Sequence, residues 1–70
     1  MMVKIEVDKE FLRQAREELG LTQDEAAKRA GITRQFLSEI ECGKKRPSAV
    51  TLARLSRVLG KIMDDFIKGD

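Results

Sequence analysis

The chain has 70 residues and a net charge of +2, with one cysteine, three aromatic residues and no histidine. An internal disulfide or a zinc cluster cannot support so small a domain here, so we expect tight helix packing, dimerisation or both, and no metal or cofactor. The missing histidine argues against an enzyme, and the few aromatic side chains argue against a protein that stacks single-stranded nucleic acid.

The first predicted elements are an extended segment and an amphipathic helix. Apolar and charged residues alternate over positions 3–7, which is typical of a short strand. Asp8 can then cap a helix over residues 9–19. We therefore divide the chain into an extended N-terminal segment, residues 1–8, and a helical domain, residues 9–68.

The second helix and its exit indicate a sharp helix-helix turn. Thr22, with a glutamate three residues later, forms a capping box sequence that begins this helix. Gly31 ends the helix, and only Ile32 separates it from Thr33, the next expected N-cap. Two helices joined so tightly must cross steeply, and alanines on the inner face let them approach closely. The sequence therefore predicts a helix-turn-helix over residues 22–41.

Three further helices complete the predicted architecture. The third helix spans about residues 34–42, and a basic loop, residues 44–47, follows it. A serine N-cap and a terminal glycine bound a fourth helix over residues 49–59. A last short helix is expected over residues 63–68. The predicted fold class is all-α, a compact bundle of five helices with a possible short N-terminal β-strand.

Two charged residues fall on faces that should be buried. Arg16 lies one turn after Leu12 on the apolar stripe of the first helix, and Glu41 lies one turn after Leu37 on that of the third. Neither charge is tolerated unpaired in a core. We therefore predict a bidentate ion pair between Arg16 and Glu41 with a structural role.

The outer side of the third helix is the candidate base-reading surface. If Leu37 and Ile40 point inward, several polar residues lie on the opposite arc or at the N-terminus of the helix. Arginine can bind guanine, glutamine can bind adenine, and serine can bond either kind of base edge. A glutamate there either accepts from a cytosine amino group or turns towards a basic neighbour. The candidate base readers are Arg34, Gln35, Ser38 and Glu39.

A second set of residues is expected to bind DNA phosphates. Free N–H groups and polar side chains at the starts of the second and third helices can meet a phosphate, and the basic loop can neutralise others. The alternative for the loop is a solubilising role. The candidates are Gln23, Thr33, Lys44, Lys45 and Arg46. Cys42, close to them, is interpreted as an incidental exposed thiol, with a redox switch at the interface as the alternative.

The distribution of charge agrees with a phosphate-facing surface. Residues 31–61 contain seven basic and two acidic residues, whereas residues 1–30 contain six basic and seven acidic ones. Basic charge is therefore concentrated in the middle of the chain. No apolar run approaches the roughly 20 residues of a membrane span, and no signal peptide is recognised, so we expect a cytoplasmic protein.

From residue 12 to residue 67 the chain resembles the phage-repressor and Cro-like helix-turn-helix family, also called the Xre family, with a lambda-repressor-like DNA-binding domain. The matching segments are Leu-Gly-Leu-Thr-Gln at 19–23, Ala-Ala-Lys-Arg-Ala-Gly at 26–31 and Ser-Glu-Ile-Glu-Cys-Gly-Lys-Lys-Arg-Pro-Ser at 38–48. The resemblance implies that the third helix is a recognition helix, which in such proteins enters the major groove of double-stranded DNA.

The resemblance also implies roles for individual residues. Residues that match Gln23 contact the DNA backbone, those that match Arg34, Gln35, Ser38 and Glu39 read bases, and those that match Arg16 and Glu41 form an internal salt bridge. The fifth helix of the family often helps to form a dimer. The residues that this predicts for the dimer interface are Ile62, Met63, Phe66 and Ile67.

The sequence departs from the family pattern at three places. Ala26 stands where leucine is usual, so the core is thinner there unless Phe36 leans in. Met63 stands where a capping serine or aspartate is common, which leaves the start of the last helix undefined. The extended residues 2–7 lie outside the family core, and one hypothesis is that they pair with a second copy of the chain.

The sequence thus favours a small transcriptional regulator, a repressor in the first instance, that binds a palindromic operator as a homodimer. The alternative is an antitoxin or other interaction protein that neutralises a toxin and autoregulates its operon, with the N-terminal strand or the apolar C-terminus as its docking surface. A co-transcribed neighbouring gene that is toxic when expressed alone would favour the alternative. A neighbouring restriction-modification pair would favour a controller protein.

Overall fold

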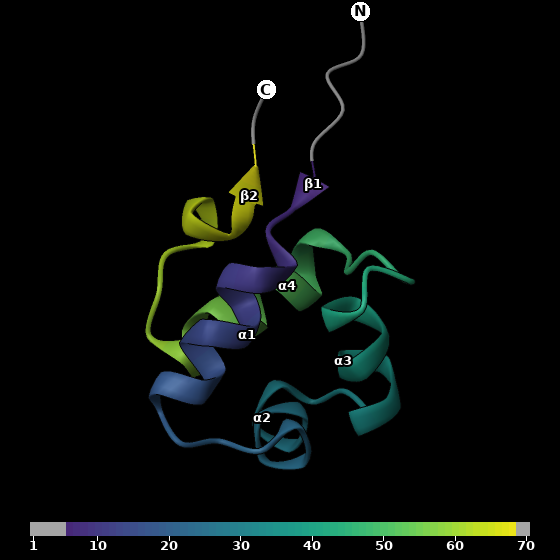
Figure 1. Cartoon of the computed structure of the whole chain (residues 1–70), viewed down its shortest axis with the longest axis vertical. Coiled ribbons are helices and arrows are strands. Elements are labelled where there is room, and N and C mark those ends of the chain that lie inside the picture. The colour runs from purple at the N-terminus through teal and green to yellow at the C-terminus, as the bar shows by residue number, and fades with distance from the viewer. Residues whose placement is uncertain (1–5, 69–70) are drawn as a thin grey trace, which may run out of the picture.

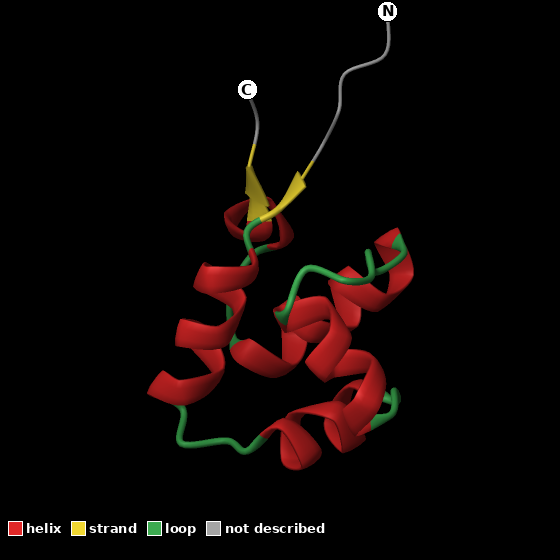
Figure 2. Cartoon of the chain, turned by 45° about the vertical axis from the view of Figure 1, so that its right-hand side comes forward, coloured by secondary structure: helices red, strands yellow, loops and turns green. Residues whose placement is uncertain are grey.

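The computed structural model describes residues 6–68, which form a bundle of four α-helices with a two-stranded sheet where the two ends of the chain meet (Figure 1). Figure 2 shows that helix dominates this part of the chain. In chain order the elements are β1 (Glu6–Val7), α1 (Lys9–Glu18), α2 (Gln23–Ala30), α3 (Arg34–Glu41), α4 (Ala49–Leu59), the 3-10 helix η1 (Met63–Phe66) and β2 (Ile67–Lys68).

Each α-helix begins at the side-chain cap that the sequence predicts. The side chains of Asp8, Thr22, Thr33 and Ser48 each accept a hydrogen bond from the backbone N–H three residues later. The capping box of α2 is complete, because the Thr22 N–H also donates to the Glu25 carboxylate at 2.9 Å. These bonds satisfy N–H groups that an uncapped helix would leave without partners.

The turn between α2 and α3 has the geometry that the sequence predicts. Gly31 adopts the left-handed conformation with φ of 74°, and its N–H donates to the carbonyl of Lys28. The Ile32 N–H donates to the carbonyl of Ala27 at 3.0 Å. Residues other than glycine rarely adopt this conformation. Gly31 therefore allows α2 to end at Ala30 and the chain to turn towards α3, which begins at Arg34.

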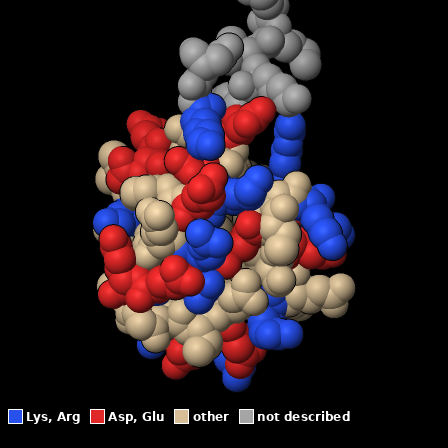
Figure 3. Space-filling view, viewed as in Figure 1, with Lys and Arg blue, Asp and Glu red and all other residues tan. Residues whose placement is uncertain are grey.

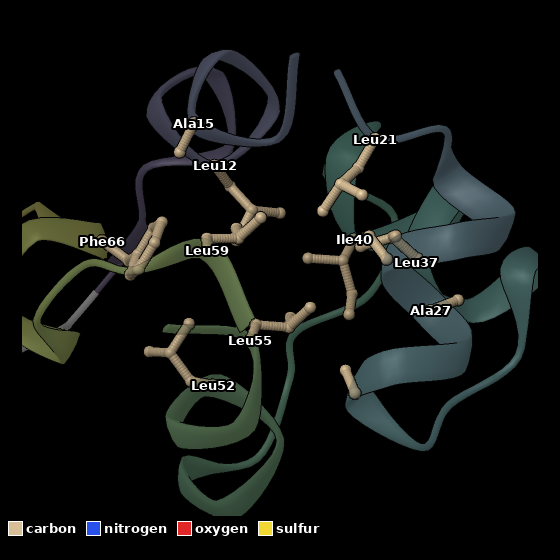
Figure 4. Close-up of a cluster of buried hydrophobic side chains, with 12 residues drawn as sticks. Leu12, Ala15, Leu21, Ala27, Leu37, Ile40, Leu52, Leu55, Leu59 and Phe66 are labelled. Atoms are coloured by element: carbon tan, nitrogen blue, oxygen red, sulfur yellow. The ribbon is translucent and has the colours of Figure 1, made fainter. Parts of the chain in front are cut away.

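The core lies where all four α-helices and η1 meet (Figure 4). Leu12, Leu37, Ile40, Leu55 and Phe66 are its largest fully buried side chains. Three small residues of α2 complete the contact with α3 and α4: Ala26, Ala27 and Ala30. Phe36 is half-buried and packs against this cluster.

The prediction of a fifth α-helix over residues 63–68 is wrong. Residues 63–66 form one turn of 3-10 helix, and Ile67 and Lys68 form β2. No side chain caps η1, since Ile62 stands at its N-cap position and its side chain has no hydrogen-bonding group. Without a cap, the chain instead pairs its last described residues with β1.

Strand β1 pairs within the chain, and the hypothesis that residues 2–7 pair with a second copy stays a prediction. The strand runs antiparallel to β2, with Glu6 opposite Lys68 and Val7 opposite Ile67. The Asp8 N–H also donates to the carbonyl of Phe66. Residues 2–5 of the predicted strand lie outside the described residues. The sheet therefore joins the two ends of the domain beside α1 (Figure 1).

Candidate nucleic-acid interface

Helix α3 buries one face and exposes the other, as predicted. Leu37 and Ile40 are 1% and 2% exposed, and they pack into the core. Arg34 and Gln35 are exposed at the start of the helix, while Ser38 and Glu39 are half-buried. The four candidate base readers therefore lie together on the outer arc of α3, which is available to a ligand.

The ion pair predicted between Arg16 and Glu41 is confirmed. The Arg16 Nε donates to Glu41 Oε2 at 2.8 Å, and Nη2 donates to Oε1 at 3.0 Å. The side chains are only 12% and 4% exposed. The hydrogen bonds to Glu41 raise the pKa of Arg16 above its ordinary value, so this side chain stays charged. The pair joins the C-terminal end of α3 to α1.

Two further hydrogen bonds extend this ion pair into a partly buried polar network. Arg16 Nη1 donates to the carbonyl of Leu21 at 2.9 Å, and Gln23 Nε2 donates to Glu41 Oε1 at 3.0 Å. The network of Arg16, Glu41, Gln23 and the Leu21 carbonyl thereby joins α1, the α1–α2 loop, α2 and α3. In residues 6–68, no buried side-chain polar atom lacks a partner. This network fixes the position of α3 relative to the start of α2.

The bond from Gln23 to Glu41 was not predicted. The sequence assigned Gln23 to a phosphate, and nothing in its neighbourhood signals a partner 18 residues away. The amide nitrogen carries a second N–H, which can donate to a phosphate while the first holds Glu41. The structure therefore orients the Gln23 amide without using up its donors.

The basic loop folds back onto the end of α3. The backbone N–H groups of Lys44 and Lys45 both donate to the carbonyl of Glu39, at 2.8 and 3.3 Å. The ammonium of Lys45 lies 3.9 Å from the Glu39 carboxylate. Glu39 thus turns towards a basic neighbour, one of the two options left open by the sequence. An exposed pair of this kind contributes about 0–1 kcal/mol, so a ligand can displace it readily.

The structure brings Lys9 into this basic region, which the sequence did not predict. Lys9 lies against Gly43, where a methyl group built on the glycine would be 3.1 Å from the lysine Nζ. Lys9, Lys45 and Arg46 line a hollow of about 230 Å³ between the start of α1 and the α3–α4 loop. Because Lys9 is far from the loop in sequence, no local pattern could have placed it there.

The surface seen in Figure 3 carries both signs of charge. Acidic side chains are most frequent on the left of the view, and basic side chains are most frequent over the centre and right, the side on which α3 lies, with acidic side chains among them. Thr33 and Arg46 are also exposed on the described surface. Cys42 is exposed with a free thiol, as expected.

Among residues 6–68 no helix is long and apolar enough to cross a membrane.

One of the four residues predicted for a dimer interface is unavailable for it. Phe66 is fully buried and makes an edge-to-face contact with Phe11, with ring centroids 5.3 Å apart. That part of the expectation is wrong, because the 3-10 helix turns Phe66 into the core of its own chain. Ile62 is 65% exposed, and Met63 and Ile67 are half-buried.

Comparison with known proteins finds helix-turn-helix proteins, in agreement with the fold described above. The model of the helix-turn-helix family matches residues 12–66. An HTH-type transcriptional regulator of Methanothermobacter thermautotrophicus is 46% identical over 59 residues, which cover 81% of this chain and 86% of the relative. The prophage-derived HTH-type transcriptional regulator YonR of Bacillus subtilis is 40% identical over 60 residues, and the match covers 86% of this chain but only 56% of YonR.

Solved structures with this fold include proteins bound to DNA. The P22 c2 repressor in complex with a synthetic operator superposes with a TM-score of 0.84 and 28% identity, covering 93% of this chain and 98% of the repressor. SinR of Bacillus subtilis, solved with DNA, superposes with a TM-score of 0.76 and 32% identity, covering 80% of this chain and 90% of that one. The similarity thus extends over the helical part of the fold.

Proposed function

The chain belongs to the helix-turn-helix family of DNA-binding transcriptional regulators, and from this premise we propose that it represses transcription as a homodimer bound to a twofold-symmetric operator. Its two recognition helices would enter successive major grooves about 34 Å apart. The structural similarity to the P22 c2 repressor supports the repressor role.

The observation that carries the proposal is the polar outer arc of α3, exposed at Arg34 and Gln35 and half-buried at Ser38 and Glu39, beside the exposed basic loop. Arg34 and Gln35 lie at the N-terminal end of α3, the part of a recognition helix that contacts base edges first. Ser38 and Glu39 follow one turn later. The polar network bonds α3 to α1 and α2 through Glu41. The network therefore restricts movement of α3 and of the four side chains on it.

Phosphate contacts would surround this arc. The N–H groups at the start of α2 and the second amide N–H of Gln23 would bind one phosphate. Thr33, Lys44, Lys45 and Arg46 would bind others, and the hollow beside Gly43 adds Lys9 to this set. Such contacts position the protein on a duplex without selecting its sequence.

Gln35→Ala provides the test of base reading. The preferred site is first obtained by selection from random duplexes and by footprinting, which should yield a twofold-symmetric sequence. We expect Gln35→Ala to relax selectivity at one position in each half-site and to weaken that site by about 1–3 kcal/mol, because adenine or another base edge loses its partner. Gln14→Ala, at an exposed position of α1, is the control and should bind as the native protein does.

Lys45→Ala should give the complementary result. A phosphate contact is independent of sequence, so selected and random duplexes should be weakened alike, and the slope of log K against log salt should fall by about 0.9 for each phosphate that is no longer neutralised. Equal losses on both duplexes for Gln35→Ala would contradict base reading by this residue. A loss confined to the selected duplex for Lys45→Ala would contradict its phosphate role.

The proposed dimer surface is centred on Ile62, with Met63 and Ile67 beside it. A large apolar side chain that is 65% exposed is a candidate for burial between subunits. Ile62→Asp should shift the protein to monomer in sedimentation experiments and weaken binding to the symmetric site far more than binding to a half-site. An unchanged oligomeric state would place the dimer contact elsewhere or exclude a dimer.

A further inference from the structure

A second basic surface lies away from the candidate DNA interface. It is a hollow of about 320 Å³ between the C-terminal end of α2 and the outer side of α4. Four cations line it: Lys28, Arg29, Arg54 and Arg57. None of its lining residues belongs to α3 or to the basic loop. We call this hollow the α2–α4 basic groove.

Most of the cations in the α2–α4 basic groove have no salt-bridge partner among residues 6–68. Lys28 lies 3.4 Å from Asp24 in an exposed i,i+4 pair. Arg29, Arg54 and Arg57 form no salt bridge with any residue between 6 and 68. The negative ends of helix dipoles account for cations in the last turns of α2 and α4. They do not account for Arg54, which lies in the middle of α4.

The position of Arg54 gives the groove its shape. The left-handed Gly31 carries no side chain, and a methyl group built there would lie 3.5 Å from Arg54 Nη1. The guanidinium therefore lies over the end of α2 and closes one side of the groove. Val58, which is half-buried, also lines the groove and gives it an apolar side chain beside the cations, and the buried Ala30 completes the lining.

This combination of charge and apolar surface decides between two classes of ligand. A DNA backbone would gain from the four cations but not from the apolar side chain of Val58. An acidic protein segment gains from both, because carboxylates form bidentate bonds with arginine while an apolar side chain beside them is buried. We propose that the α2–α4 basic groove binds an acidic segment of a partner protein, with carboxylates on Arg54 and Arg57 and an apolar side chain on Val58.

This binding site goes beyond the proposed DNA-binding role and does not depend on it. Since the two surfaces share no residue, the partner and a duplex can be bound at the same time. The acidic segment would neutralise part of the basic charge of the domain. A regulator built in this way can be connected to another protein while α3 remains in the major groove.

The experiment uses the full chain and a synthetic peptide of alternating glutamate and leucine, with a peptide of glutamine and leucine as its uncharged control. Binding is measured by NMR titration at low ionic strength. We expect the acidic peptide to shift the amide signals of Gly31 and Val58, and we expect Arg54→Ala/Arg57→Ala to weaken binding by about tenfold or more for each arginine, as loss of a charged hydrogen bond predicts.

The matched control is Lys44→Ala/Lys45→Ala, which removes the same number of charges from the candidate DNA interface. It should lose duplex affinity and keep the acidic peptide, whereas Arg54→Ala/Arg57→Ala should do the reverse. Both arginines are exposed, so the variant should melt as the native protein does.

Equal peptide affinity in the two double variants, or equal affinity for the two peptides, would overturn the proposal. Loss of duplex binding in Arg54→Ala/Arg57→Ala would instead assign the groove to DNA, and failure of the native chain to bind any duplex would refute only the DNA-binding proposal.

Discussion

The helix-turn-helix of residues 22–41 and the terminal unit of residues 6–8 and 62–68 are stabilised in different ways. In the first, the cap side chain at the start of each helix accepts a hydrogen bond from the backbone N–H three residues later, and α2 ends at a left-handed glycine. In the second, η1 has no side-chain cap, and its residues are held by strand pairing between the two ends of the chain and by burial of Phe66. Local bonds set where the helices of the first region begin and end, whereas the second region is held mainly by long-range contacts.

The difference explains which part of the fold could be predicted. Caps and glycines act on neighbours in the sequence, so the starts of α2 and α3 follow from the residues themselves. The strand that replaces the end of the predicted fifth helix depends on Val7, which lies at the other end of the chain. No local pattern reports such a pairing, and apolar residues at 62–67 suit a helix as well as a turn and a strand.

The candidate site shows the same division. The outer arc of α3 could be predicted because burial of Leu37 and Ile40 fixes the direction of the opposite face. The ion pair of Arg16 and Glu41 could also be predicted, since both charges fall on apolar stripes. The contact of Lys9 with Gly43 and the bond from Gln23 to Glu41 could not, because they require the helices to be placed in space first.

The largest expected effect comes from Phe66→Ala, which breaks the terminal unit. Phe66 is fully buried, and removing a buried phenyl ring costs about 3–5 kcal/mol of unfolding free energy through reduced burial and the cavity left behind. Denaturant unfolding measures the loss. Hydrogen exchange should show that the Asp8 amide, which donates to the Phe66 carbonyl, loses protection before the amides of α2 do. Equal loss in both regions would mean that the two units do not differ in local stability.

Glu41→Ala tests the long-range support of the helix-turn-helix. It leaves Arg16 charged in a site where its side chain is only 12% exposed. We expect a cost of about 3 kcal/mol, at the lower end for a broken buried pair, because Arg16 keeps its bond to the carbonyl of Leu21. Duplex affinity should fall as well, since Gln23 loses the acceptor that orients it.

The double variant Arg16→Met/Glu41→Leu separates charge from packing. Apolar replacement of both partners of a buried ion pair is often neutral or stabilising, so it should restore most of the stability that Glu41→Ala loses. It should not restore the orientation of Gln23, and duplex affinity should stay low. Full recovery of binding would show that the network supports the fold only and does not position Gln23.

The smallest expected effects concern the capping box, where the helix-turn-helix depends on local bonds. Thr22→Ala should lower the unfolding free energy by about 1 kcal/mol, which corresponds to a fall in Tm of about 4–8 °C, because the Glu25 N–H loses its acceptor. The same change at Ser48, the cap of α4, is the matched comparison. A negligible effect at Thr22 alone would show that long-range packing is sufficient to begin α2.

The second hydrogen bond of the capping box, from the Thr22 N–H to the Glu25 carboxylate, makes the stability of the fold depend on pH. The Thr22 backbone N–H, followed by the Thr22 side chain, lowers the pKa of Glu25 below its ordinary value of 4.5. A carboxyl whose pKa is lower in the folded state stabilises the fold above its unfolded pKa, and this contribution is lost as the pH falls through the folded pKa. The difference in Tm between the native chain and Glu25→Gln should therefore be constant near neutrality and shrink in acid below pH 4.5. A difference in Tm that persists unchanged in strong acid would mean that the Glu25 charge contributes nothing to the start of α2.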